Sequence, residues 1–190
     1  IDGPVSVGVN DAGHDVKFFG DTATNGYMLW DQSEDDLILG SSSKLGIGGA
    51  PTLDVAGGTV ANSQIIGTDA GAALTVGRFS NDSGGASIIL AKSRAASQSA
   101  FDSTPVIVAD NDYVGSINFC VDDGGDLRSD VASIRAEVDD GTPAANETGG
   151  ALVLSTTAVD SNGATERVRI DSSGNVGIGD SDPDMDVEIK

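Results

Sequence analysis

The sequence predicts an all-β protein built from short antiparallel strands and hairpins. One observation is that short runs of alternating apolar and polar residues recur along the 190-residue chain, separated by turns rich in Gly and Asp. Another is that the chain contains 26 Gly, 5 Pro and 25 Asp against only 5 Glu. Gly, Pro and Asp are poor in helix interiors and favoured in turns, so we expect no helix longer than two turns.

Hairpins are predicted near both ends of the chain. After a predicted strand at 16–19 (VKFF), residues 27–30 (YMLW) are expected to pair with 37–39 (LIL) through a turn. Near the C-terminus, residues 152–154 (LVL) pair with 168–170 (VRI) through a longer loop.

The middle of the chain alternates with period two. In the run 114–121, Ile117, Phe119 and Val121 share one face. In the run 132–138, Ala132, Ile134, Ala136 and Val138 point one way, whereas Ser133, Arg135 and Glu137 point the other. Further strands are expected at 73–79, 87–91, 106–109, 152–155 and 167–170.

An internal repeat organises the sequence. Residues 37–48 (LILGSSSKLGIG) align without gaps to 168–179 (VRIDSSGNVGIG), and the similarity continues to a proline. The repeated residues are Gly46, Ile47, Gly48 and Pro51, and Gly177, Ile178, Gly179 and Pro183. Glycines on both sides of one Ile permit close backbone approach or positive φ, which suits a crowded axis where several chains meet. The alternative is an ordinary hairpin and loop within one chain.

The repeats predict three parts. They are an N-terminal hairpin unit at 1–58, a middle β section at 59–149 and a C-terminal hairpin unit at 150–190. Because the chain begins at Ile1, without Met or a signal-peptide pattern, we expect a fragment or a processed product.

The charge excludes several partners. A formal net charge of −20 repels nucleic acid and anionic membranes. No apolar run approaches the ~20 residues needed for membrane insertion. The acid excess fits either a saline habitat or a merely solvated acidic surface. Cys120 is the single cysteine, so no internal disulfide can form, and we expect it to be a small buried hydrophobe.

The sequence favours no catalytic or cofactor chemistry. The only histidine, His14, lies in a turn-like segment, and no nucleophile elbow accompanies it. Each Gly-Ile-Gly lacks the third glycine and following helix of a dinucleotide site. We therefore expect no enzyme and no organic cofactor. Asp122, Asp123 and Asp126 around two glycines could bind calcium, although a solvated turn is the alternative.

Several of these segments resemble known proteins. Residues 167–179 (RVRIDSSGNVGIG) with Pro183 closely resemble the shaft-closing segment of tail-fibre and appendage proteins of tailed viruses. Residues 15–20 (DVKFFG) and 27–31 (YMLWD) are similar to a segment common in marine phage structural proteins. Where that family commonly has Thr and Ser after Gly-Ile-Gly, this chain has Asp180-Ser181-Asp182, which fits a halophilic or marine virus.

The resemblance implies a parallel homotrimer in which three chains build a β-prism or an intertwined shaft. It implies a virion appendage outside the cell, attached to other tail or capsid proteins, that contacts a host-surface glycan or protein receptor. In such fibres the Gly-Ile-Gly-Pro segment often precedes a self-cleaving chaperone domain that drives trimerisation. Two alternatives are a surface adhesin or filament module of a halophilic or marine microbe, and a tail spike that degrades polysaccharide.

Overall fold

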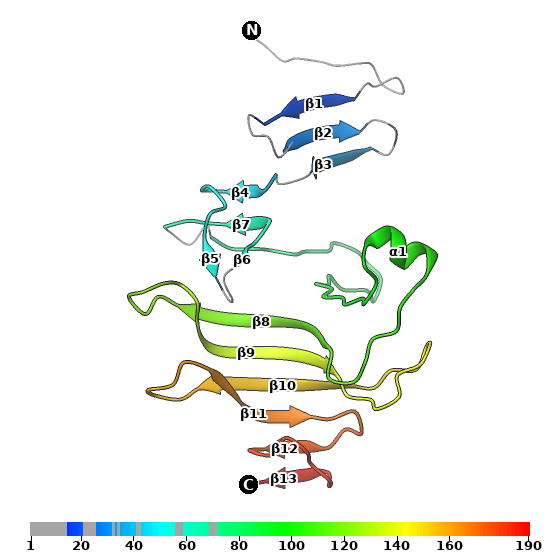
Figure 1. The fold of residues 1–190 in the computed structure, drawn as a ribbon, viewed down its shortest axis with the longest axis vertical. Coiled ribbons are helices and arrows are strands. Elements are labelled where there is room, and N and C mark those ends of the chain that lie inside the picture. Colours follow the sequence, from blue (N-terminus) through cyan, green and yellow to red (C-terminus); the bar gives the residue numbers. More distant parts are fainter. Residues whose placement is uncertain are drawn as a thin grey trace. The chain divides into compact units, whose positions relative to one another are not determined.

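The computed structural model describes residues 15–20, 26–31, 33, 35–40, 43–55, 59–68 and 72–190. The described part is almost entirely β, with thirteen strands and one six-residue helix (Figure 1). The all-β prediction is therefore confirmed, and so is the expectation that no helix there exceeds two turns. The chain divides into two compact units, residues 1–53 with 60–75, and residues 54–59 with 76–190.

The first unit contains a three-stranded antiparallel sheet in the order β1-β2-β3. Its strands are β1 (Val16–Phe19), β2 (Tyr27–Asp31) and β3 (Asp36–Gly40). The pairing of Asp31 with Asp36 closes the β2–β3 hairpin where the sequence predicted it. Shorter strands follow, namely β4 (Leu45–Ile47) and β7 (Ser63–Ile65) in this unit, and β5 (Asp54–Val55) and β6 (Thr59–Val60) where the chain passes between the two units. β4 pairs in parallel with β7, and β5 pairs with β6.

The second unit is built on a six-stranded sheet in the order β13-β12-β11-β10-β9-β8 (Figure 1). The strands are β8 (Tyr113–Val121), β9 (Ser129–Val138), β10 (Gly150–Thr157), β11 (Ala164–Ile170), β12 (Val176–Ile178) and β13 (Val187–Ile189). All neighbours are antiparallel except β12 and β13. The predicted part boundary at 149/150 falls between β9 and β10 of this one sheet.

The single helix has a simple local cause. Helix α1 (Gln98–Ser103) begins after Ser97, whose hydroxyl accepts a 3.1 Å hydrogen bond from the Ala100 amide. A serine at this position satisfies one of the amides that the first helical turn leaves unpaired. The helix ends after one and a half turns at Thr104, whose amide donates to the Ala100 carbonyl.

Three predicted strands are wrong. Residues 73–79, 87–91 and 106–109 are assigned to no strand. Their alternating or apolar composition is strand-like, but a strand also needs a partner for its backbone groups. No backbone hydrogen bond joins 73–79 or 87–91 to another described segment. Apolar side chains in these segments are largely exposed, with Phe79 and Ile89 at 102% and 81%.

Candidate functional site

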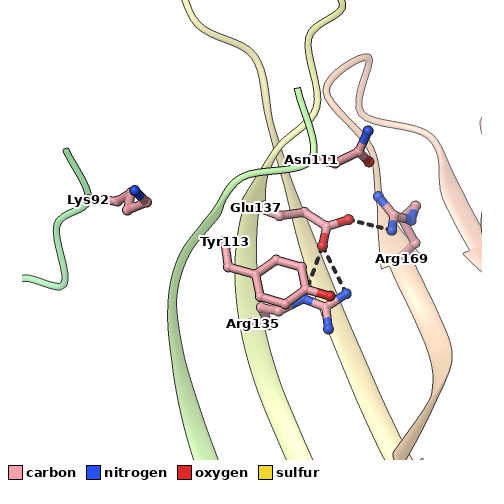
Figure 2. A pocket seen from close by; sticks show the side chains of 6 residues that line it. All are labelled: Lys92, Asn111, Tyr113, Arg135, Glu137 and Arg169. Atoms are coloured by element: carbon pink, nitrogen blue, oxygen red, sulfur yellow. Dashed lines mark hydrogen bonds and ion pairs between the residues drawn. The ribbon is translucent and has the colours of Figure 1, made fainter. Parts of the chain in front are cut away.

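A hollow of about 460 Å³ lies on one face of the six-stranded sheet (Figure 2). Its lining residues are Lys92, Asn111, Tyr113, Arg135, Glu137 and Arg169. Tyr113 lies on β8, Arg135 and Glu137 on β9, and Arg169 on β11. Lys92 comes from a separate segment, apart from the other five in Figure 2. The register places Tyr113 opposite Glu137, and Val153 opposite both Arg135 and Arg169, so these residues point to the same face.

Glu137 is the anchor of this hollow. Its side chain is 5% exposed, and each carboxylate oxygen is ion-paired with a different arginine. Oε1 accepts from Arg169 Nη2 at 2.5 Å, and Oε2 accepts from Arg135 Nη2 at 2.8 Å and Nε at 3.0 Å (Figure 2). Arg169 also donates to both oxygens of Glu166 at 2.9 Å. A charge this deeply buried is tolerated only when it is paired in this way.

The arginines also shape the sheet around them. Val153, between Arg135 and Arg169 on the neighbouring strands, is 0% exposed. The long apolar stems of arginine can cover such a residue while their charged ends stay near water. Hydrogen bonds to Glu166 and Glu137 raise the pKa of Arg169 above its ordinary value. The Arg169 guanidinium is therefore a fixed cation at neutral pH.

The other lining residues differ in how firmly they are held. The Arg135 guanidinium lies 4.3 Å from the centroid of the Tyr113 ring, a cation–π contact. Asn111 has a φ of 63°, and its backbone N–H donates a 2.9 Å hydrogen bond to the Val138 carbonyl. Lys92 donates from Nζ to the Ser93 carbonyl at 3.0 Å and forms no ion pair in the described part of the chain.

The opposite face of the same sheet is a second candidate surface. The register brings apolar side chains from all six strands to it, and nine of the large ones are between 38% and 72% exposed. We call these nine the apolar face: Ile117, Phe119, Ile134, Leu152, Leu154, Ile170, Ile178, Val187 and Ile189. Each of these side chains exposes about 100 Å² of apolar surface, so together they offer roughly 900 Å². The largest apolar patch on a typical monomer is about 300–600 Å².

The small sheet of the first unit has the same property. Val16, Trp30 and Leu37 are paired across its three strands, as are Phe18, Met28 and Leu39. All six residues are apolar and lie on one face. Trp30 is 42% exposed, and Phe18, Met28, Leu37 and Leu39 are between 37% and 63% exposed. Both units therefore carry a sheet face on which large apolar side chains are exposed.

The two Gly-Ile-Gly segments adopt equivalent geometry. Both form short strands, β4 and β12, that pair in parallel with a later strand. Gly48 and Gly179 have positive φ values of 81° and 75°, which L residues with side chains rarely adopt. A Cβ at Gly46 would clash with the carbonyl oxygen of Gly49. A Cβ at Gly177 would clash with the carbonyl oxygen of Asp180. In both repeats the clashing carbonyl therefore lies three residues after the glycine.

The residues around the repeat are also equivalent. The Ile66 amide donates to the Ile47 carbonyl at 2.9 Å, and the Lys190 amide donates to that of Ile178 at 3.0 Å. Pro51 packs beside Gly46, and the Pro183 carbonyl accepts from Asn175 Nδ2 at 3.1 Å. The Ile side chains at the centres of the two repeats, Ile47 and Ile178, are 50% and 41% exposed. Each repeat therefore presents its Ile outward from a tightly constrained turn.

The predicted calcium residues lie in the turn between β8 and β9, where their carboxylates already have partners. Asp122 accepts from the Gly124 amide at 2.8 Å, and Asp126 accepts from the Arg128 amide at 2.9 Å. Asp123 accepts from the Ser129 hydroxyl at 2.6 Å and from the Gly125 amide at 2.9 Å. These bonds, that from Ser129 first, lower the pKa of Asp123. Among the described residues, no three His, Cys, Asp or Glu side chains form a group that could hold a metal ion, and calcium stays a prediction.

The remaining predicted residues have simple placements. His14 lies outside the described residues. Cys120 is half-buried rather than fully buried, and its thiol lies 3.0 Å from Oδ1 of Asp130. The sequence pattern does not predict the hollow, although it places Arg135 and Glu137 together on the polar side of their strand. The missing information was the register that brings Arg169 and Tyr113 beside them.

No family model matches the chain, and no curated protein matches it. No helix in the described part is long and apolar enough to cross a membrane.

Proposed function

We propose that this chain is a non-enzymatic segment of a homotrimeric attachment fibre on the virion of a tailed virus, exposed outside the cell. The observation that carries the proposal is the apolar face. Its roughly 900 Å² is close to the ~800 Å² that each partner contributes to a stable protein–protein interface. A second and a third copy of the same chain are the occupants that fit it.

Two further observations support association between copies. Residues 73–79 and 87–91 are strand-like in composition, yet their backbone groups have no partner among the described segments. Such segments can complete their hydrogen bonds by adding to a sheet of another chain. Each Gly-Ile-Gly repeat also presents one exposed branched side chain from a turn that only glycine can form. That arrangement suits a narrow axis shared by three chains, as the fibre resemblance implies.

The hollow supports a binding role rather than a catalytic one. Sugar-cleaving sites use two carboxyl groups, one of which acts as an acid. Both oxygens of Glu137 are occupied by arginines, and Glu166 is paired with Arg169. Release of sugar products from a host polysaccharide by the purified chain would favour the polysaccharide-degrading alternative instead.

A matched pair of variants on β8 tests the assembly. Ile117 belongs to the apolar face and is 54% exposed, so an Asp there costs little in an isolated chain. Asn118, the next residue, is exposed and points to the opposite face. We expect Ile117→Asp to convert the trimer to monomer in size-exclusion chromatography with light scattering, whereas Asn118→Asp stays trimeric. Identical assembly of both variants would contradict an interface on the apolar face.

A further inference from the structure

We infer that the hollow lined by Tyr113, Arg135 and Arg169 binds a sugar unit carrying an anionic group. This inference rests on the proposed attachment function, because it names the chemistry of the receptor that the fibre would contact. The same hollow does not belong to the apolar face, so it stays accessible when copies associate through that face.

The charge of the hollow is opposite to that of the protein. Three of the ten Lys and Arg residues line it, against one carboxylate, although the chain as a whole carries −20. Glu137 and Glu166, which is paired with Arg169, neutralise part of this charge and leave a local excess of one positive charge. A concentration of cations in a strongly acidic protein points to a ligand that is itself anionic.

The two arginines are already oriented for such a ligand. Glu137 uses Nε and Nη2 of Arg135, and Glu137 and Glu166 use Nε and Nη2 of Arg169. The Nη1 group of each arginine therefore has two N–H donors that these carboxylates do not use. Because Glu137 holds both side chains, little conformational entropy is lost when an anionic group binds them. Hydrogen bonds between charged groups are also stronger than neutral ones.

Tyr113 and Asn111 add features that favour a sugar over a free anion. The Tyr113 side chain is 61% exposed, and Arg135 covers one face of its ring. Its remaining surface combines an apolar ring with a hydroxyl, and it can pack against the C–H face of a sugar ring while bonding a hydroxyl. Asn111 is held at φ 63°, a left-handed conformation that Asn adopts more readily than most residues. Its amide oxygen can accept from another sugar hydroxyl.

The dimensions agree with this class of ligand. A volume of about 460 Å³ lies within the range of small-ligand sites, roughly 300–1,000 Å³. Nucleic acid carries sugars and phosphates too, but a polymer with a charge on every unit is repelled by the remaining acidic surface. A saccharide with occasional anionic groups meets less repulsion.

The test compares matched β-1,4-linked tetrasaccharides. Isothermal titration of the full chain is carried out with a mannose tetramer that carries one mannuronate unit, with the same tetramer of neutral mannose, with a mannose tetramer that carries one sulfate and with inorganic sulfate. We expect the anionic tetramers to bind at least tenfold more tightly than the neutral one and than free sulfate. The relative affinities of the carboxylated and sulfated tetramers identify the anionic group. Equal binding of the neutral and anionic tetramers, or binding of none, would overturn the inference.

Three variants locate the binding. Lys92 is exposed and forms no ion pair in the described part of the chain, so we expect Lys92→Gln to leave the sheet intact. Tyr113 is also exposed, and Tyr113→Leu keeps an apolar side chain at its position. Each is expected to weaken uronate binding about fivefold to tenfold, whereas Lys44→Gln, an exposed lysine of the other unit, leaves it unchanged. Unchanged affinity in both Lys92→Gln and Tyr113→Leu would also overturn the inference. Measuring the native mass of the same samples separates the two proposals. A trimer that does not bind the tetramers refutes only the binding site. A monomer that binds them refutes only the trimeric assembly.

Discussion

Removing the Glu137 carboxylate is expected to be the most damaging single change on the polar face of the sheet. In Glu137→Ala, Arg135 and Arg169 lose their shared partner and face each other across Val153. Breaking a fully buried ion pair costs about 3–5 kcal/mol. The side chains of Arg135 and Arg169 are 24% and 12% exposed, so water recovers part of this loss. We expect the free energy of unfolding to fall by about 2–3 kcal/mol.

Chemical denaturation measures this change. Urea titrations at one fixed protein concentration should show a lower midpoint with an unchanged slope, because the surface exposed on unfolding is the same. In a thermal melt the loss corresponds to roughly 10 °C for a unit of this size. Glu147→Ala is the matched control, since Glu147 is exposed in a turn and has no ion pair in the described part of the chain. If Glu137→Ala unfolds within about 0.5 kcal/mol of the parent, the ion network does not stabilise the sheet.

Three other predictions concern the turns and carboxylates. Gly48→Ala places a side chain at φ 81° against the Ile66 carbonyl and should lower stability by about 1–3 kcal/mol, whereas Gly85→Ala, in open space, should change it little by the same urea titration. Hydrogen bonds from Arg94 and the Ala109 amide lower the pKa of Asp112, so its contribution is present above about pH 4 and is lost as pH falls through its folded pKa. The difference in melting temperature between the parent and Asp112→Asn should therefore be constant from pH 5 to 8 and shrink below pH 4; a constant difference down to pH 2 would contradict this. The calcium hypothesis predicts that chelation lowers the melting temperature and that Asp123→Asn abolishes this effect, and an unchanged melt rejects it.

Much of the fold follows from local pattern, and the hairpins illustrate why. The β2–β3 turn, the alternation of β9 and the pairing of β10 with β11 depend on residues close in sequence, so period and turn chemistry were sufficient. The failures at 73–79, 87–91 and 106–109 have a different cause. Alternation indicates which residues can form a strand, but a strand exists only where another segment pairs with it.

The hollow could not be predicted for a related reason. Arg135 and Glu137 are two residues apart, but Arg169 reaches them only because β10 lies between β9 and β11 in a particular register. A shift of one residue would move Arg169 to the other face. The apolar face, by contrast, was visible in the sequence as Ile134 and Ala136 on one side of β9. The exposure of this face could not be predicted, because an alternating pattern shows which face is apolar but does not show what covers it.

The mass of the chain under native conditions tests the central claim most directly. Association through the apolar faces into a fibre segment predicts a particle of three times the 19.0 kDa chain mass, stable on dilution. A stable monomer, or a dimer, would contradict it.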